Sequence, residues 1–385
     1  MELFPDVVTS KLPQTGTSVF AVMSQMAREH NAINLSQGFP DFPVSEHMVE
    51  LVHKYMREGH NQYAPMPGLP WLREAIAEKT EFLYSAQYDP ETEITVTAGA
   101  TQAIFTAIMS LIREDDEVIV FEPAYDSYVP AIKLAGGVPI CVQLKLPDYH
   151  IDWSEVKKVI SGRTRMIIIN SPHNPSGSIL SAADMMQLEK LTKNSSILIL
   201  SDEVYEHIIF DGREHQSVCR YPNLARRSLV MCSFGKTFHA TGWKMGYCLA
   251  PANLMKEFRK THQFVVFCVN TPVQYAIAEY LQNKDHYMHL GSFYQEKRDY
   301  FLQLIATSRF KVVPASGTYF QVLDYSRISE ESEMDFATRL TREFGVASVP
   351  NSYFYNKPVN NQTLRFCFAK GNETLEKAAE ILCRI

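Results

Sequence analysis

Two lysines eight residues apart carry the clearest chemical signal in the sequence. Lys236 follows closely on the apolar run Leu229–Cys232, and Lys244 lies in Thr241–Tyr247, a stretch of turn-forming and bulky residues. Two cations beyond one strand suit an anionic ligand such as a phosphate ester. One lysine can neutralise the phosphate, while burial and like charge lower the pKa of the other and make it a nucleophilic amine. A single loop lysine is usually only solvated, so this interpretation needs partners elsewhere in the chain.

Three further segments offer such partners, and each also has an ordinary structural explanation. Ala98–Gln102 joins an apolar strand to an apolar helix, whose first N–H groups and dipole can hold a phosphate. Asp202 ends the apolar run Ile197–Ser201 and either caps a helix or pairs with a buried cation. Arg365 lies inside an apolar strand, where burial demands an anion from the chain or from a ligand.

The elements that would position these residues alternate between strand and helix. We predict strands at Glu93–Thr97, Glu117–Phe121, Val138–Gln143, Met166–Asn170, Ile197–Ser201 and Leu229–Cys232. Helical patterns such as Thr101–Ile112 and Ala182–Thr192 lie between them. Several of the strands are unbroken apolar runs, which is typical of strands covered on both faces. The pattern predicts an α/β fold with a mainly parallel sheet between helices and ligand sites at the carboxyl ends of the strands.

The two ends of the chain differ from this middle part. After about Asp285 a long helical stretch leads to Phe310–Asp324, which alternates like a strand pair, and then to a helix at Met334–Phe344 and a strand at Thr363–Ala369. This order predicts a smaller α+β domain. We therefore expect an N-terminal arm and small-domain segment over 1–45, a large domain over 46–282 and a small C-terminal domain over 283–385.

Composition excludes several classes of protein. A net charge of -6 without a basic run argues against a nucleic-acid partner. The seven cysteines are scattered and show no metal-ligand or redox spacing, so we expect no metal site and free thiols in a reducing compartment. Met1–Asp6 lacks the pattern of a signal peptide, and no apolar stretch approaches the ~20 residues that span a bilayer. The sequence predicts a soluble, cytoplasmic protein without membrane contact.

Taken together, the motifs resemble those of fold-type I enzymes that use pyridoxal phosphate (PLP), specifically the class I and II aminotransferases. The similarity runs from Asn34–Pro40 to Arg365, and it is closest to the branch of kynurenine aminotransferases, glutamine transaminases and bacterial methionine aminotransferases. Several independent motifs occur in the family's order, which makes the resemblance specific.

The resemblance assigns a cofactor role to each motif. Lys236 would form the imine with PLP and move the substrate's Cα proton, and Asp202 would hold the pyridine nitrogen protonated so that the ring accepts electrons. Tyr205 and Asn174 would hydrogen-bond the cofactor's 3′-oxygen, and Tyr125 would stack on its ring. The phosphate cup would comprise Ala100, Thr101, Gln102, Ser233 and Lys244. Many relatives carry arginine where this chain has Lys244, and lysine keeps the charge but loses the two-pronged contact.

The resemblance also implies a substrate site shared between two subunits. Arg365 would grip the substrate α-carboxylate with help from Asn174, and Gly38 would line the site. Tyr63 matches a tyrosine that reaches across from a neighbouring subunit, which implies a homodimer with composite active sites. His173, beside Asn174, has no catalytic role in this interpretation and is expected to be structural.

The expected reaction moves the amino group of an L-amino acid to a 2-oxo acid. Aromatic residues near the site (Phe39, Tyr63, Tyr125 and Phe354) and the lack of a second pocket arginine favour an apolar, thioether or aromatic side chain, with methionine preferred. A cysteine-S-conjugate β-lyase would need the same residues and stays open as an alternative. A non-catalytic PLP-binding regulator would need a DNA-binding module of ~60 residues ahead of this portion, and the sequence offers none.

Overall fold

The computed structural model describes residues 9–13 and 15–385, and a seven-stranded sheet forms its centre. The N-terminal stretch Met1–Asp6 lies outside the described residues. The sheet order is β2-β8-β7-β6-β5-β3-β4. Its strands are β2 (Ile94–Thr97), β3 (Glu117–Glu122), β4 (Val138–Gln143), β5 (Thr164–Asn170), β6 (Leu198–Asp202), β7 (Ser228–Ser233) and β8 (Gly246–Leu249). Neighbouring strands run parallel except β8, which is antiparallel to both β2 and β7.

Helices cover both faces of this sheet, which explains the unbroken apolar runs in its strands. Successive side chains of β3 enter opposite layers: Val118 and Val120 join one apolar cluster, and Ile119 and Phe121 join the other. The first cluster is closed by α4 (Gly99–Leu111), α5 (Tyr128–Leu134) and α10 (Ala252–Val265), and the second includes residues of α6 (Trp153–Val159) and α7 (Ala182–Thr192). The sheet is therefore buried on both sides.

The remaining elements around the large sheet are mostly short or lie at its edge. They are α2 (Glu46–Arg57), α3 (Pro70–Tyr84), η1 (Val218–Arg220), α8 (Pro222–Ala225), α9 (Phe234–Thr237), η2 (Thr241–Trp243), α11 (Thr271–Tyr280) and α12 (Asp285–Met288). The functionally important members are α9 and η2, because they follow β7 and carry or precede the two lysines.

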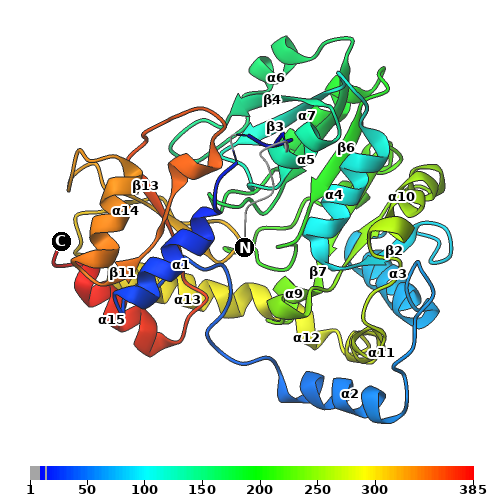
Figure 1. Cartoon of the computed structure of the whole chain (residues 1–385), viewed down its shortest axis with the longest axis horizontal. Coiled ribbons are helices and arrows are strands. Elements are labelled where there is room, and N and C mark those ends of the chain that lie inside the picture. Colours follow the sequence, from blue (N-terminus) through cyan, green and yellow to red (C-terminus); the bar gives the residue numbers. More distant parts are fainter. Residues whose placement is uncertain (1–8, 14) are drawn as a thin grey trace, which may run out of the picture.

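A second, smaller unit combines both ends of the chain (Figure 1). Its antiparallel sheet has the order β12-β13-β10-β9, built from β9 (Lys311–Val312), β10 (Phe320–Asp324), β12 (Val349–Pro350) and β13 (Thr363–Cys367). The helices beside it are α1 (Val19–Glu29), α13 (Leu290–Leu304), α14 (Glu333–Arg342) and α15 (Asn372–Leu382), with η3 (Asn351–Phe354) after β12. β1 (Ile33–Asn34) pairs in parallel with β11 (Val346–Ala347), so the N-terminal segment joins the C-terminal part.

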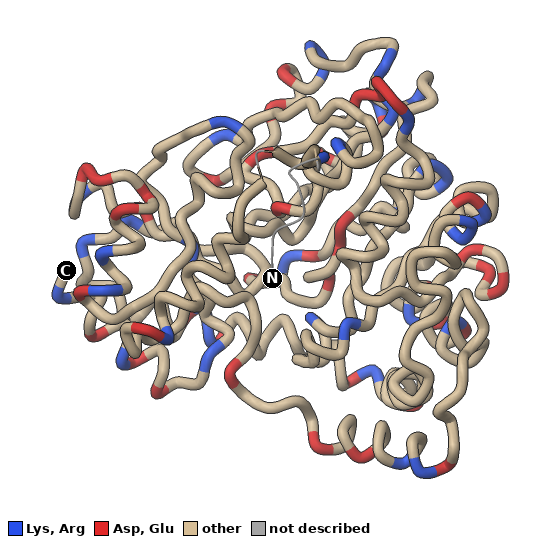
Figure 2. Tube along the Cα trace, in the orientation of Figure 1, with Lys and Arg blue, Asp and Glu red and all other residues tan. Residues whose placement is uncertain are grey.

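Lysine and arginine positions alternate with aspartate and glutamate positions along most of the chain trace (Figure 2). Within residues 9–13 and 15–385, no helix is long and apolar enough to cross a membrane. All seven cysteines are free thiols.

Candidate active site

A cavity of about 300 Å³ opens at the carboxyl ends of β5, β6 and β7, beside the start of α4 and the strand β13. Most of the residues singled out from the sequence line it: Gly38, Ala100, Thr101, Tyr125, Asn174, Asp202, Tyr205, Ser233, Lys236, Lys244 and Arg365. These residues are far apart in the sequence, from Gly38 to Arg365. They meet in this cavity because the parallel strands end at one edge of the sheet, and the smaller unit packs against that edge.

Two of the expected residues lie elsewhere. The Gln102 side chain accepts a hydrogen bond from Ala98 N at 3.0 Å and donates to Thr106, so it shapes the turn before α4 instead of facing the cavity. Tyr63 lies on the surface with 84% exposure, and its ring meets Phe267 edge-on at 5.5 Å. A single chain therefore leaves Tyr63 outside the site.

One end of the cavity is suited to an anion. The Lys244 amine lies directly over the start of α4, because a Cβ added to Gly99 would be 3.4 Å from Lys244 Nζ. The first turn of a helix has N–H groups without intrahelical partners, and they favour negative charge. Lys244 adopts a left-handed backbone (φ +55), which closes the turn after η2. A phosphate placed here would meet both a cation and free N–H donors.

The cavity lining also includes the buried carboxylate of Asp202. Asp202 is 3% exposed; it accepts hydrogen bonds from Tyr128 Oη at 2.5 Å and Val204 N at 3.3 Å. Burial raises the pKa of Asp202 to about 6. In the described part of the chain no basic side chain forms an ion pair with it. A ligand with a protonated ring nitrogen would supply the missing positive charge.

Lys236 has the properties of a nucleophilic amine. Its Nζ donates to Gly38 O at 3.0 Å and to Tyr319 Oη at 2.9 Å. Burial, assisted by the positive charges of Arg365 and Lys244, lowers the pKa of Lys236 to about 8. A substantial fraction of the amine is therefore neutral near pH 8, as nucleophilic attack and proton abstraction require.

Arg365 is buried in β13 without a carboxylate partner. It is 1% exposed; Nη1 donates to Asn174 Oδ1 at 2.7 Å and Nη2 to Ser36 O at 3.1 Å, while Nε has no partner. Its guanidinium carbon lies 3.9 Å from the ring centroid of Phe320. The sequence left an internal ion pair open as an alternative, and no such pair occurs among the residues described. The arginine thus keeps capacity for an external carboxylate.

The structure adds residues that the sequence interpretation missed. Asn170 Nδ2 donates to Asp202 O at 2.8 Å, and its Oδ1 accepts from Asn174 N at 2.8 Å, which ties two strand ends together. The sequence did contain one signal for Asn170: it is a polar residue at the end of a predicted apolar strand, where a parallel sheet presents its ligand groups. Phe20, Gln37, Tyr128 and Tyr319 carried no comparable local signal.

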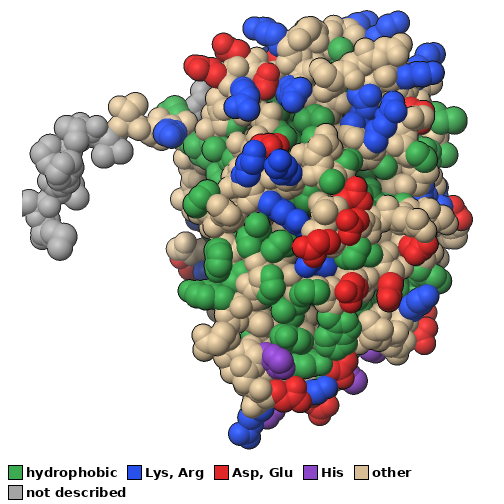
Figure 3. Space-filling model, turned by 90° about the vertical axis from the view of Figure 1, so that its right-hand side faces the viewer, with side chains coloured by type: hydrophobic (Ala, Val, Ile, Leu, Met, Phe, Trp, Pro, Cys, Tyr) green, Lys and Arg blue, Asp and Glu red, His purple; other side chains and the backbone are tan. Residues whose placement is uncertain are grey.

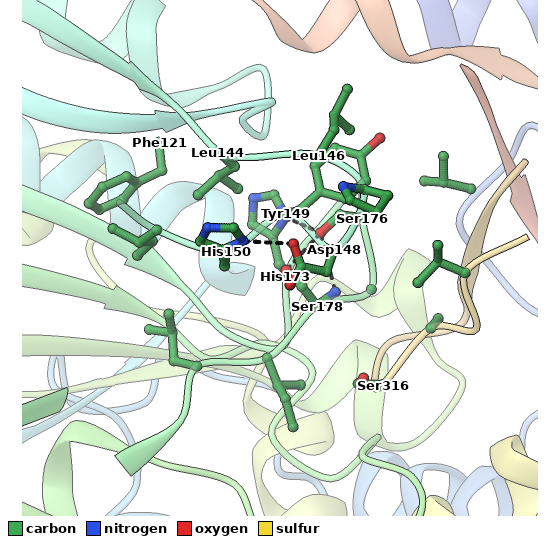
Figure 4. A pocket seen from close by; sticks show the side chains of 18 of the residues that line it. Phe121, Leu144, Leu146, Asp148, Tyr149, His150, His173, Ser176, Ser178 and Ser316 are labelled. Carbon is green, nitrogen blue, oxygen red and sulfur yellow. Dashed lines mark hydrogen bonds and ion pairs between the residues drawn. The ribbon is translucent and has the colours of Figure 1, made fainter. Parts of the chain in front are cut away.

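A larger cavity, of about 730 Å³, is lined by residues of the large sheet and of the smaller unit, and its polar side chains include Asp148, His150, His173 and Ser176 (Figure 4). His173 is buried there with Nδ1 2.6 Å from Ser176 Oγ, and burial lowers the pKa of His173 to about 4. Lys311 contributes an exposed amine that pairs with Asp324 at 3.4 Å. These contacts agree with a structural role for His173, and the chemistry is concentrated in the smaller cavity.

Comparison with known proteins identifies the class. The model of the family "Aminotransferase class I and II" matches residues 30–382. The chain belongs to this family, and the α/β fold and the aminotransferase class expected from the sequence are confirmed.

The individual relatives are similar over nearly their whole length. Methionine aminotransferase of Escherichia coli is 48% identical over 379 residues, covering 98% of each chain. Human kynurenine–oxoglutarate transaminase 1 is 31% identical and covers 93% of each. A crystal structure from Escherichia coli described as having a methionine aminotransferase function superimposes with a TM-score of 0.97 at 47% identity, covering 99% of this chain and 100% of the other.

Proposed function

We propose that this aminotransferase uses PLP and takes its amino group from methionine or another L-amino acid with an apolar, thioether or aromatic side chain. The observation that carries the proposal is Arg365, which lines the same cavity as Lys236 and forms no ion pair with a carboxylate of the described residues. The 48% identity to a methionine aminotransferase supports methionine as the preferred donor.

The residues of the cavity fit PLP. Lys244 and the start of α4 would hold the phosphate, and Asp202 would pair with the ring nitrogen. Tyr205 and Asn174 would hydrogen-bond the 3′-oxygen, with Tyr125 against the ring. When bound, PLP supplies an electron sink for the charge that develops at the substrate Cα. Asp202 and Lys244 both line the cavity and form no ion pair within the described chain, which supports this assignment.

The protein's own groups divide the remaining work. Arg365 would bind the substrate carboxylate through paired N–H donors and fix the position of Cα. The neutral amine of Lys236 would take the Cα proton and later return a proton to the reacting system as general base and acid. Arg365 is buried and Lys236 is half-buried, so a substrate bound in the cavity would shield the proton transfer from much of the solvent.

The cavity wall favours an apolar substrate side chain. Phe20, Ile104, Tyr125 and Phe320 line it, and Arg365 is the one arginine among its described lining residues. A donor with a second carboxylate would lack a cationic partner beyond the groups already committed to phosphate and α-carboxylate. Desolvating that carboxylate would then be costly.

We propose that the active form is a homodimer. Tyr63 and Phe264 are each 84% exposed, and Phe267, which touches Tyr63, is 48% exposed. Figure 3 views the side of the molecule on which α3 and α10 lie and shows hydrophobic side chains gathered over its lower half. Such exposed apolar patches mark association surfaces. Sedimentation should give twice the chain mass; Phe264→Asp should shift it to monomer, whereas the surface change Met186→Asp on α7 should not.

An amino-donor panel with one fixed 2-oxo acid tests the function. Methionine and aromatic donors should give the highest kcat/KM and aspartate the lowest, and a strong preference for aspartate would overturn the apolar-side-chain assignment. Lys236→Ala should abolish turnover and the absorbance band of the bound cofactor. A β-lyase would instead release pyruvate and ammonia from a cysteine S-conjugate without any 2-oxo acid.

A further inference from the structure

Tyr319 forms a hydrogen bond with the amine of Lys236. It directly precedes β10 and is fully buried. Tyr319 Oη lies 2.9 Å from Lys236 Nζ and 2.6 Å from Gly38 O, and Lys236 Nζ lies 3.0 Å from the same carbonyl. The three polar atoms form a closed triangle in which each contacts the other two.

The geometry fixes which atom donates. Gly38 O is a carbonyl oxygen and can only accept, so the hydroxyl proton of Tyr319 is directed to it. The hydroxyl oxygen then accepts from Lys236 Nζ. Neighbouring rings hold the phenol in place: Tyr205 lies edge-on with centroids 5.1 Å apart, and Tyr294 is tilted at 5.6 Å. Tyr319 is therefore a preorganised acceptor aimed at the lysine.

We propose that Tyr319 is a positioning residue for Lys236: together with Gly38 O it receives the lysine amine whenever that amine is not bound to the cofactor, and it orients the amine for proton transfer at the substrate Cα. This inference rests on the proposed function. An ammonium group has three N–H donors. Tyr319 Oη and Gly38 O occupy two of them, which leaves one N–H, the one that carries the transferred proton.

The proton balance of the step is simple. The C–H bond at Cα breaks, its proton forms an N–H bond with the neutral Lys236 amine, and the electron pair stays on the substrate–cofactor side. Accepting hydrogen bonds from the ammonium favours the charged form of lysine, so Tyr319 strengthens Lys236 as a base. The Tyr319 contact thus raises the pKa of Lys236, whereas burial and the positive charges of Arg365 and Lys244 lower it.

Other groups near Lys236 also change the pKa of its amine. The carboxylate of Asp202 on β6 favours the charged amine, and Tyr205 places its ring centroid 5.7 Å from Nζ. Cys367 on β13 would favour the charged amine only as a thiolate, and burial raises the pKa of its thiol. Of these neighbouring side chains, Tyr319 is the one that forms a direct hydrogen bond to Nζ in the described chain. Removing its hydroxyl deletes this contact together with the hydrogen bond to Gly38 O, so readouts that report on the lysine amine itself are needed.

The test compares Tyr319→Phe with the matched variant Tyr294→Phe in the PLP-loaded enzyme. Tyr294 is equally buried and packs on Tyr319, but its hydroxyl has no hydrogen-bond partner among the described residues. Both variants keep every ring contact and should retain the wild-type melting behaviour. Tyr319→Phe should lower kcat with methionine by about tenfold or more while KM changes by less than about threefold.

Two further readouts separate positioning from general structural damage. With Cα-deuterated methionine, the isotope effect on kcat should rise in Tyr319→Phe, because proton transfer becomes slower relative to the other steps. In the cofactor-free protein, the rate of PLP capture follows the neutral fraction of Lys236, so its pH midpoint should fall in Tyr319→Phe. Tyr294→Phe should leave both measurements unchanged.

The outcomes distinguish the inference from the proposed function. Wild-type protein that fails to transaminate any donor would refute the proposed function itself. Active wild type with Tyr319→Phe indistinguishable from Tyr294→Phe in kcat, isotope effect and pH midpoint would overturn the role of Tyr319. A kcat loss with an unchanged isotope effect and midpoint would also overturn it, because the change would then act away from the amine.

Discussion

The hydroxyl of Tyr128 donates a hydrogen bond to Asp202 Oδ2 across 2.5 Å at the base of the active-site cavity. Both residues are buried. Within the described structure, Tyr128 is the side chain that donates a hydrogen bond to the Asp202 carboxylate. Burial raises the pKa of Asp202 to about 6, and the Tyr128 contact acts in the opposite direction. Tyr128 therefore helps to keep charged the carboxylate that the cofactor is expected to need, together with the N–H of Val204.

Cofactor affinity should depend on the ionisation of Asp202. As pH falls through about 6, Asp202 gains a proton and loses the charge that attracts a protonated ring nitrogen, so affinity for PLP should decrease. Tyr128→Phe should move this transition to higher pH, because it removes the contact that lowers the pKa. This pH dependence can be measured by fluorescence titration of the cofactor-free protein with PLP from about pH 5 to about pH 8.

Asp202→Asn provides the control for this pH dependence. Its affinity should be lower at neutral pH and should lack the step near pH 6. If the step persists in Asp202→Asn, another group is responsible for it.

Arg365 should contribute to substrate binding and little to folding. Arg365→Met removes a buried guanidinium that has no carboxylate partner, so the melting temperature should stay the same or rise. Loss of the carboxylate contact should cost about 3 kcal/mol, which lowers kcat/KM by about a hundredfold for amino donor and 2-oxo acid alike. Steady-state kinetics and thermal unfolding on the same preparation test both statements. A destabilised variant with normal kcat/KM would contradict them.

The buried ion pair between Lys79 and Glu206 should stabilise the segment behind the active site. Lys79 Nζ lies 2.7 Å from Glu206 Oε1, and Glu206 directly follows Tyr205. Burial alone would raise the pKa of Glu206, but the Lys79 ammonium holds it below its usual value. Lys79→Met leaves the carboxylate unpaired and should lower the free energy of unfolding by about 3–5 kcal/mol in a urea titration.

The sign of the pH dependence follows from the lowered pKa of Glu206. The pair stabilises the protein above the unfolded-state pKa of about 4.3, and this stabilisation is lost as pH falls through the lower folded-state value. The double variant Lys79→Met with Glu206→Gln should recover much of the unfolding free energy that Lys79→Met alone loses. Equal stability of the single and double variants would argue against an ion-pair effect.

Lys244 should determine affinity for the phosphate of the cofactor. Lys244→Ala removes the cation over the start of α4 and should weaken PLP binding by about tenfold to a hundredfold, in line with a charge-assisted hydrogen bond. Lys244→Arg should retain most of the affinity. Inorganic phosphate should compete with PLP in the wild type and much less in Lys244→Ala. Lys311→Ala, in the larger cavity, is the control and should bind PLP normally.

The sequence alone determined the fold class and the main ligand groups. Unbroken apolar runs such as Ile197–Ser201 require two covered faces, and alternation with helices makes the sheet mainly parallel. Lys236 and Asp202 were recognisable because each follows or ends such a run, where a parallel sheet presents its ligands. The antiparallel direction of β8 and the pairing of Ile33 with Val346 had no local signal.

Tertiary structure decided which partner each of these groups has. Tyr128 reaches Asp202 across 74 residues of sequence, and Tyr319 reaches Lys236 across 83. Such contacts depend on strand order and on the packing of the smaller unit against the sheet, which no local pattern encodes. The same applies to Arg365: the sequence showed that a buried arginine needs an anion, and only the folded structure showed that it forms no ion pair with a carboxylate of the described residues.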